Sequence, residues 1–241
     1  MLTASRVATA FAVAVLFATR LPAASVDINP VRIDFADAER PAELKLTNTG
    51  EQDMSVQIDS LRWEQGAEAS DELIATDRLL VVPPIVTIPA GGQQIIRIGY
   101  VGTPDPEREQ SFRLLITELM PETDSDRSTG LALRMRFSIP AFVPPQDVPA
   151  RPDVILSGVE TIDDRLLLTV ENQGNAHARL GTVQVRGDRG WEDLPGSHQL
   201  RYLLSGTVAT IEVPPGIDRP RAVRFISVDG RDWEYAVDLR N

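Results

Sequence analysis

Three successive runs of the sequence alternate apolar and polar residues: P84-I-V-T-I-P-A-G-G-Q-Q-I-I-R-I98, R108-E-Q-S-F-R-L-L-I-T-E-L-M-P121 and L131-A-L-R-M-R-F-S-I-P140. Such alternation is typical of a strand that is buried on one face only. Prolines at the ends of the runs and the Gly91-Gly92 pair inside the first run favour tight turns. Alternation in the third run places Leu131, Leu133, Met135 and Phe137 on one face and Arg134 and Arg136 on the other.

The rest of the chain continues the same pattern of short strands and turns. No segment keeps a period of 3.6 over the ~10 residues that a helix would need. Five prolines lie between positions 140 and 152, where they remove the backbone donors that a sheet interior requires. The sequence therefore predicts an all-β protein: two immunoglobulin-like β-sandwich domains, residues 25–146 and 147–241, joined at an angle by a proline-rich elbow.

The first 24 residues have the form of a secretory signal peptide. A short basic region precedes an almost entirely apolar run over residues 7–18, and small residues follow it. We expect cleavage near Ala23 or Ala24 and export to the periplasm. The apolar run is shorter than the ~20 residues of a membrane-spanning helix, so no membrane insertion is expected.

Composition argues against several function classes. The formal net charge is −11, and −13 after Arg6 and Arg20 leave with the signal, so phosphate backbones would repel the chain and nucleic acid is not an expected partner. With no cysteine, thiol catalysis and Cys-ligated metals are excluded. The only histidines, His177 and His198, lack the neighbours of a metal or catalytic site, and His177 is predicted to be a turn residue. We expect no catalytic residues, metal or cofactor.

The remaining candidate site is basic. Arg32 lies in the opening run V26-D-I-N-P-V-R-I-D-F35, whereas Arg134 and Arg136 lie in the run that closes the same domain. First and last strands of a sandwich often lie near one another. Guanidinium groups from both could bind one carboxylate in bidentate fashion.

These runs resemble the first domain of the PapD-like periplasmic chaperones of chaperone–usher pilus assembly. The likeness rests on the opening strand with Arg32, the P-x-x-x-x-P-x-G run from Pro84, and R-E-x-x-F from Arg108. It implies a chaperone that binds pilus or fimbrial subunits and delivers them to an outer-membrane usher. It also implies that Arg32 and a second basic residue, Arg136 or in reserve Arg134, bind the C-terminal carboxylate of a subunit.

The resemblance further implies donor-strand complementation, in which the last strand of the first domain completes the unfinished sandwich of a subunit. Leu131, Leu133 and Met135 are the expected apolar donor residues. The alternative for these residues is that they only pack in the core of the chain's own first domain.

One departure from the family concerns the link between the domains. Many members have an arginine at the position assigned to Ile139, where it joins the residues matching Glu109 and Asp229 in an interdomain salt bridge. Without it, we expect domain orientation to depend on the elbow and on apolar contacts of Ile139 and Phe142. Charge reversal at Glu109 should then have little effect on that orientation.

Two other function classes compete with the chaperone. One is an exported immunoglobulin-like structural or adhesive surface protein without chaperone activity, for which a longer N-terminal donor extension than residues 25–30 would be expected. The other is an exported hydrolase, which the missing catalytic motifs disfavour.

Overall fold

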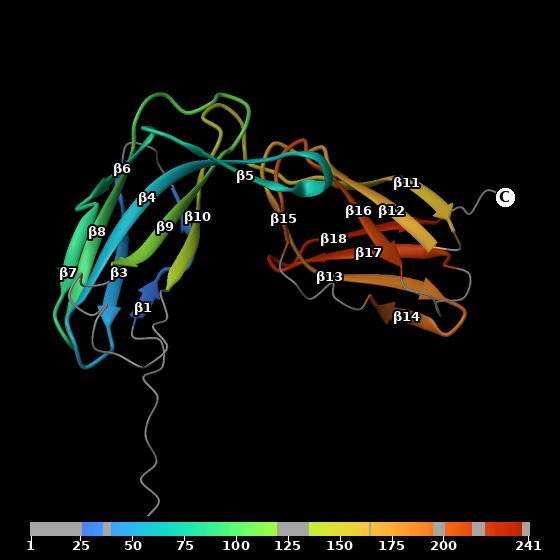
Figure 1. Ribbon diagram of the computed structural model, residues 1–241. Coiled ribbons are helices and arrows are strands. Elements are labelled where there is room, and N and C mark those ends of the chain that lie inside the picture. Colours follow the sequence, from blue (N-terminus) through green and yellow to red (C-terminus); the bar gives the residue numbers. More distant parts are fainter. Residues whose placement is uncertain are drawn as a thin grey trace, which may run out of the picture.

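Two β-sandwich domains make up the protein. The computed structural model describes residues 26–35, 40–119, 135–163, 165–194, 201–213 and 220–237. Figure 1 shows the two domains side by side, at an angle to each other. The predicted fold class, all-β with two sandwiches joined at an angle, is confirmed.

The first domain contains ten strands in two sheets. One sheet has the order β1-β3-β8-β6; the other has the order β2-β10-β9-β4-β5, with β7 also paired to β4. Alternating residues of both sheets meet in one apolar core, whose members include Leu44, Ile96 and Leu114. The strands are β1 Val26–Asn29, β2 Ile33–Asp34, β3 Ala42–Asn48, β4 Met54–Gln65, β5 Asp71–Ala75, β6 Leu79–Val82, β7 Ile85–Ile88, β8 Gln93–Tyr100, β9 Gln110–Leu119 and β10 Arg136–Val143.

The second domain is a smaller sandwich with its own core around Val170, Val185 and Phe225. Its sheets have the orders β11-β12-β16 and β14-β13-β17-β18, with β15 paired to β13. The segment between β10 and β11 covers residues 144–153 and contains the proposed division at 146/147. The strands are β11 Val154–Ile162, β12 Arg165–Asn172, β13 Ala178–Gly187, β14 Gly190–Asp193, β15 Arg201–Leu203, β16 Val208–Val213, β17 Ala222–Ser227 and β18 Asp232–Ala236.

Strand β10 continues through Pro140, the residue with which the third alternating run of the sequence ends, as far as Val143. Glu118 N donates to Met135 O at 3.1 Å. Because backbone groups alternate between the two edges of a strand, the N–H and C=O groups of the odd-numbered residues of β10 point toward β9. The nitrogen of Pro140 therefore faces the opposite edge, toward β2. The missing N–H costs no ladder bond there, because β2 pairs only with Ala141 and Phe142.

Each domain contains a turn that is stabilised in the same way by the side chain of a buried asparagine. Asn48 and Asn172 are fully buried, and each accepts a hydrogen bond from the backbone N–H two residues later. The side-chain amide of each also donates to two carbonyls, one four residues later and one on a distant segment. Position 174, two residues after Asn172, requires a glycine, because the Cβ atom of any other residue would lie 2.3 Å from the backbone oxygen of Arg151. The polar groups of both turns are thus satisfied inside the protein.

A hairpin of the first domain extends to the second. Strand β4 is 12 residues long, and its end, the 3-10 helix η1 Ala67–Ala69 and β5 lie against the second domain (Figure 1). Glu68 Oε2 accepts from Thr210 N at 2.9 Å, and Ala69 packs on the second core. The connection between the domains is therefore double: the proline-rich segment and this hairpin.

Candidate functional site

Aromatic side chains from both domains meet at the junction. The ring of Tyr202 in β15 lies 5.4 Å from Trp63, 5.6 Å from Phe142 and 5.5 Å from His177, measured between ring centres. The ring of His177 stacks on Phe142 at 3.6 Å with an interplanar angle of 13°. Trp63, Phe142 and Leu204 are buried and form an apolar cluster separate from the two domain cores. The junction is thus a packed interface of its own.

A buried Glu–His pair crosses this interface. The Oε1 atom of Glu109 lies 2.7 Å from Nδ1 of His177 and accepts a hydrogen bond from the backbone N–H of His177 at 3.0 Å. The side chains are only 7% and 10% exposed. Glu109 therefore has an interdomain partner, which the sequence analysis did not anticipate, and His177 is an interface residue more than a turn residue.

Further hydrogen bonds between the two domains fix their relative position. The side chain of Gln65 donates to Tyr202 O and accepts from Leu204 N, both at 2.9 Å. Asn175 Nδ2 donates to Glu107 O at 3.0 Å, while Asn175 O accepts from Glu109 N at 2.9 Å. Domain orientation therefore depends on specific polar contacts as well as on the elbow and the aromatic cluster.

Ile139 does not take part in this interface. Its side chain is 6% exposed and belongs to the core of the first domain, whereas Phe142 lies in the interface as expected. Alternation explains the difference, because odd-numbered residues of β10 face the core and Phe142 faces outward toward the second domain. The expectation that Ile139 makes interdomain contacts is wrong.

Arg32 lies in the short segment between β1 and β2, next to the second domain. Its Nε atom is 2.8 Å from Asp34 Oδ2, and its Nη1 atom is 3.8 Å from Asp229 Oδ1 of the second domain. Nη1 is buried and makes no hydrogen bond. Burial lowers the pKa of Arg32, but the charge of Asp34, its hydrogen bond to Arg32 and the charge of Asp229 outweigh this effect and raise the pKa above its ordinary value. Arg32 is thus a fixed cation with one N–H group still to satisfy.

The structure does not bring Arg136 to Arg32. Ala141 pairs with Ile33, so Pro140 lies level with Arg32, and Arg136 is four residues further along β10. At the usual rise per strand residue the separation along the strand is roughly 13 Å. Arg136 is exposed. Arg134 lies outside the described residues, so for both arginines carboxylate binding stays a prediction.

Two other arginines lie at the junction and escaped the sequence analysis. The guanidinium of Arg113 in β9 lies 3.6 Å above the ring of Trp63, and burial lowers its pKa. Arg179 in β13 lies 5.8 Å from the ring centre of Tyr202, and its Nε atom is buried without a hydrogen-bond partner. Alternation along β9 and β13 predicts that both arginines lie on the polar face of their strands, but nothing in the sequence indicates that both lie at the domain junction.

Of the expected donor residues the structure describes only Met135, which is half-buried; Leu131 and Leu133 lie outside the described residues. The edge of β10 next to them is informative. Among the described strands, β2 covers β10 only at Ala141 and Phe142, so residues 136–140 have a neighbour on one side alone. Their free edge can pair with a further strand.

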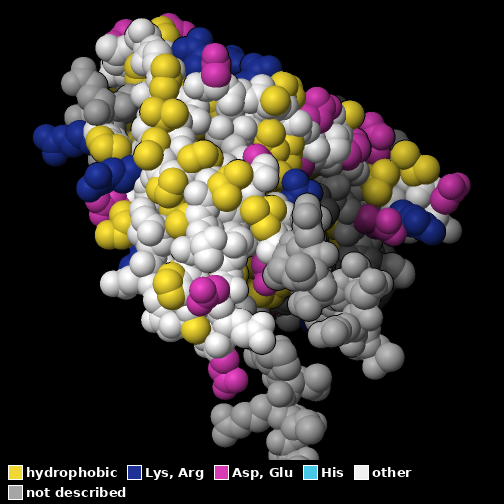
Figure 2. Space-filling model, turned by 60° about the vertical axis from the view of Figure 1, so that its left-hand side comes forward, with side chains coloured by type: hydrophobic (Ala, Val, Ile, Leu, Met, Phe, Trp, Pro, Cys, Tyr) yellow, Lys and Arg dark blue, Asp and Glu magenta, His cyan; other side chains and the backbone are white. Residues whose placement is uncertain are grey.

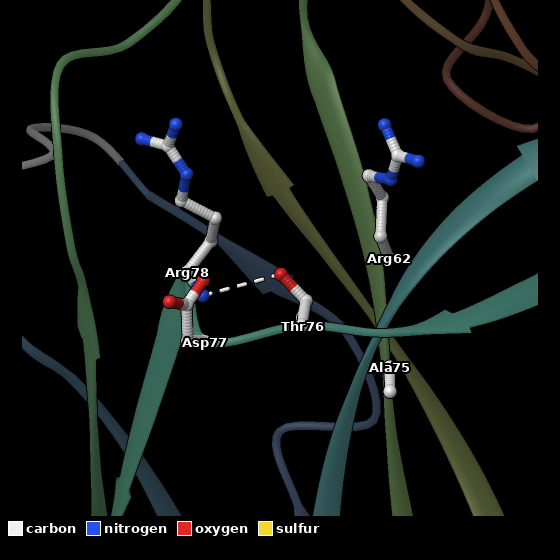
Figure 3. Close-up of a pocket in the computed structure, with 5 residues that line it drawn as sticks. All are labelled: Arg62, Ala75, Thr76, Asp77 and Arg78. Atoms are coloured by element: carbon white, nitrogen blue, oxygen red, sulfur yellow. Dashed lines mark hydrogen bonds between the residues drawn. The ribbon is translucent and has the colours of Figure 1, made fainter.

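Other sites are weaker candidates. The described residues hold no group of three or more His, Asp or Glu side chains that could bind a metal. An open hollow of about 540 Å³ is lined by Arg62, Ala75, Thr76, Asp77 and Arg78 (Figure 3). Arg62 is already paired with Glu64 at 2.9 Å. No helix in the described part of the chain has the length and apolar character needed to cross a membrane.

Comparisons with known proteins agree with this arrangement. The family model described as pili and flagellar-assembly chaperone, PapD N-terminal domain, matches residues 25–149. A sequence search of curated proteins gave no match.

Solved structures of the same fold include three chaperones or their complexes. A chain of the CsuC–CsuE chaperone–tip adhesion subunit complex of Acinetobacter baumannii is 22% identical, with a TM-score of 0.66 over 88% of this chain and 97% of that one. A chain of the SafA pilin–SafB chaperone complex of Salmonella enterica is 20% identical (TM-score 0.63; 90% and 98%). The CupB2 chaperone of Pseudomonas aeruginosa is 17% identical (TM-score 0.58; 88% and 100%).

Proposed function

The chain belongs to the family of pili and flagellar-assembly chaperones with a PapD N-terminal domain, and we propose that it binds pilus or fimbrial subunits in the periplasm by donor-strand complementation. The activity is one of binding, protection and delivery, without a chemical step. The CsuC–CsuE and SafA–SafB structures are complexes of a chaperone with a subunit, which supports a subunit as the partner of this chain.

The observation that carries the proposal is the position of Arg32. A guanidinium that is fixed by Asp34, lies at the domain junction and keeps one buried N–H unsatisfied is suited to bind an incoming carboxylate. The C-terminal carboxylate of a subunit is such a group. A charge-assisted contact of this kind would fix the end, and hence the register, of the subunit strand.

The free edge of β10 supports the second part of the proposal. Backbone groups of residues 136–140 can extend the subunit sheet, and the apolar side chains predicted to enter the subunit groove lie just before them in the sequence: Leu131, Leu133 and Met135. Main-chain hydrogen bonds would supply affinity and the alternating side chains would supply specificity. The uncapped subunit edge would otherwise be free to aggregate.

A separate surface supports delivery to an outer-membrane usher. Figure 2 shows hydrophobic side chains gathered on one face of the first domain. Strands β6, β7 and β8 expose Leu80, Val82, Ile85 and Ile95, each between 47% and 57% accessible. An apolar patch of this kind on a soluble protein marks an interaction surface. We place the usher contact here, away from the subunit site.

Co-expression with a candidate subunit, followed by co-purification, tests the proposal. Arg32→Ala should abolish capture and leave the melting temperature nearly unchanged, because both carboxylates that pair with Arg32 are more than half exposed and such ion pairs contribute at most about 1 kcal/mol. Arg97→Ala, at an exposed arginine paired only loosely with Glu43 at 3.9 Å, is the matched control and should bind normally. Normal capture by Arg32→Ala would remove Arg32 from the site, whereas failure of the parent protein to capture a subunit would favour a surface protein without chaperone activity.

A further inference from the structure

The end of the long hairpin of the first domain lies on an edge strand of the second domain (Figure 1). Among the described strands β16 pairs with β12 only, so its other edge is open. Thr210 N of β16 donates to Glu68 Oε2 at 2.9 Å, and Ala69 packs on the core of the second domain. Because backbone groups alternate between the two edges of a strand, those of Val208 and Glu212 face the same open edge as Thr210 N. The hairpin end therefore covers the middle of this edge.

Strand β16 is well suited to pair with a foreign strand. Its sequence V-A-T-I-E-V, residues 208–213, contains one charge and neither proline nor glycine, and its register with β12 is regular over all six residues. The single charge, Glu212, lies 3.6 Å from Arg165 of β12. Short segments of high β-propensity and low net charge are sites of aggregation when they lie on an open edge. An uncovered β16 would therefore invite edge-to-edge pairing.

The other edge strands of the second domain carry protective features of their own. The register of β11 with β12 shifts between Leu156 and Gly158, and such a bulge disturbs pairing along an edge. Strand β18 exposes Asp232 and Glu234, while β14 and β15 are only four and three residues long. Charges and short length likewise oppose edge pairing. As described, β16 has no bulge and a single, paired charge, and the hairpin end covers it instead.

The backbone of the hairpin end is strained in this position. Glu68 has a φ of 55° and a ψ of 33°, and Ala69 has a φ of 52°. This left-handed region is unfavourable for residues with a Cβ atom and is normally occupied by glycine or asparagine. Such strain persists only where contacts with the surrounding structure hold it, and here those contacts are with the second domain. A glycine at position 68 would remove the strain together with the carboxylate that binds Thr210.

We propose that the hairpin end, residues 66–70, is an edge guard: it covers β16 and so prevents the second domain from pairing with a second copy of this chain. Without the guard, two copies could pair β16 with β16 in antiparallel fashion about a two-fold axis, with the same open-edge residues on both sides. The guard goes beyond the proposed function, which concerns the edge of β10. It restricts strand pairing to that edge, because a second regular edge would compete for strands.

A shortened hairpin tests the guard on the full mature chain. Gln65 and Asp71 are directly paired across β4 and β5, so an Asn-Gly turn in place of residues 66–70 closes the hairpin without a change of register. Sedimentation velocity over a concentration series measures self-association, and hydrogen exchange of the amides of residues 208–212 locates the interface. The shortened chain with Thr210→Lys is the rescue variant, because a lysine on an exposed edge opposes pairing.

We expect the shortened variant to self-associate at least about tenfold more tightly than the parent protein. In dilute solution the amide of Thr210 should exchange faster than in the parent, because its hydrogen bond is lost; at high concentration the amides of Val208, Thr210 and Glu212 should become protected. Thr210→Lys should return association to the level of the parent. Glu68→Ala should have a smaller effect in the same direction, whereas Glu72→Ala, at an exposed glutamate on β5 of the same hairpin, should behave as the parent.

Two results would overturn the proposal. If the shortened variant associates no more tightly than the parent, the edge of β16 needs no cover. If it associates more tightly but Thr210→Lys does not reverse this, or the amides of residues 208–212 stay unprotected, the copies meet at another surface. Should the shortened variant not fold, Glu68→Ala decides the question: association and Thr210 exchange equal to those of the parent would likewise contradict the guard.

Discussion

The Glu109–His177 pair should couple the two domains energetically. Glu109 Oε1 serves two donors of His177 at 2.7 and 3.0 Å, and both side chains are at least 90% buried. Hydrogen bonds to a charged group contribute about 1.5–3 kcal/mol, and a buried donor left unpaired costs a similar amount. Glu109→Ala should therefore lower the free energy of unfolding by about 3 kcal/mol. His177→Ala, which also loses the stack on Phe142, should cost about as much.

A double-mutant cycle isolates the pair. The double variant should lose about 4–5 kcal/mol in place of the additive value of about 6 kcal/mol, which corresponds to a coupling of about 1–2 kcal/mol. Urea unfolding gives the free energies, and small-angle scattering of each variant reports whether the angle between the domains changes. Glu107→Gln, at an exposed position two residues away whose backbone alone contacts Asn175, is the control and should be neutral.

Additivity of the two single variants within about 0.5 kcal/mol, together with unchanged scattering, would refute the reasoning. It would mean that the elbow and the apolar cluster fix the orientation, as the sequence suggested. Charge reversal at Glu109 is expected to be more harmful than Glu109→Ala, because a buried lysine would face His177 without an acidic partner.

The remaining predictions concern stability. Ile139→Arg should destabilise the first domain by several kcal/mol in urea unfolding, because it places a charge in an apolar core; a neutral result would mean that the side chain reaches the interface. Asn48→Ala and Asn172→Ala should each cost about 3 kcal/mol and act on different domains, as hydrogen exchange can resolve; equal effects on both domains would contradict this. Burial raises the pKa of Tyr235 above 10.0, and its hydroxyl donates to Val154 O at 2.7 Å. The neutral phenol thus contributes stability that is complete below pH 10 and is lost as pH rises through the folded-state pKa, and Tyr235→Phe should show a shallower decline in melting temperature above pH 10.

The class of fold was readable from local pattern. Alternation over residues 84–98 and 108–121, turn residues between the strands and five prolines at 140–152 specify sandwiches and an elbow without any long-range information. The turn at Asn172 also has a local cause, because N-x-G supplies a side-chain acceptor and a small residue within three positions. Family membership follows from the same motifs.

The partners of individual side chains were decided only by tertiary structure. Arg134 and Arg136 were expected near Arg32 because they lie on the last strand of the domain and Arg32 on the first, and the family resemblance favoured Arg136. Which residues of two strands are level depends on register, however, and β2 meets β10 at Ala141 and Phe142. A one-dimensional pattern says which face a residue occupies and nothing about what packs on that face. The same limit hid the pair of Glu109 with His177, 68 residues apart, because only the angle between the domains brings them together.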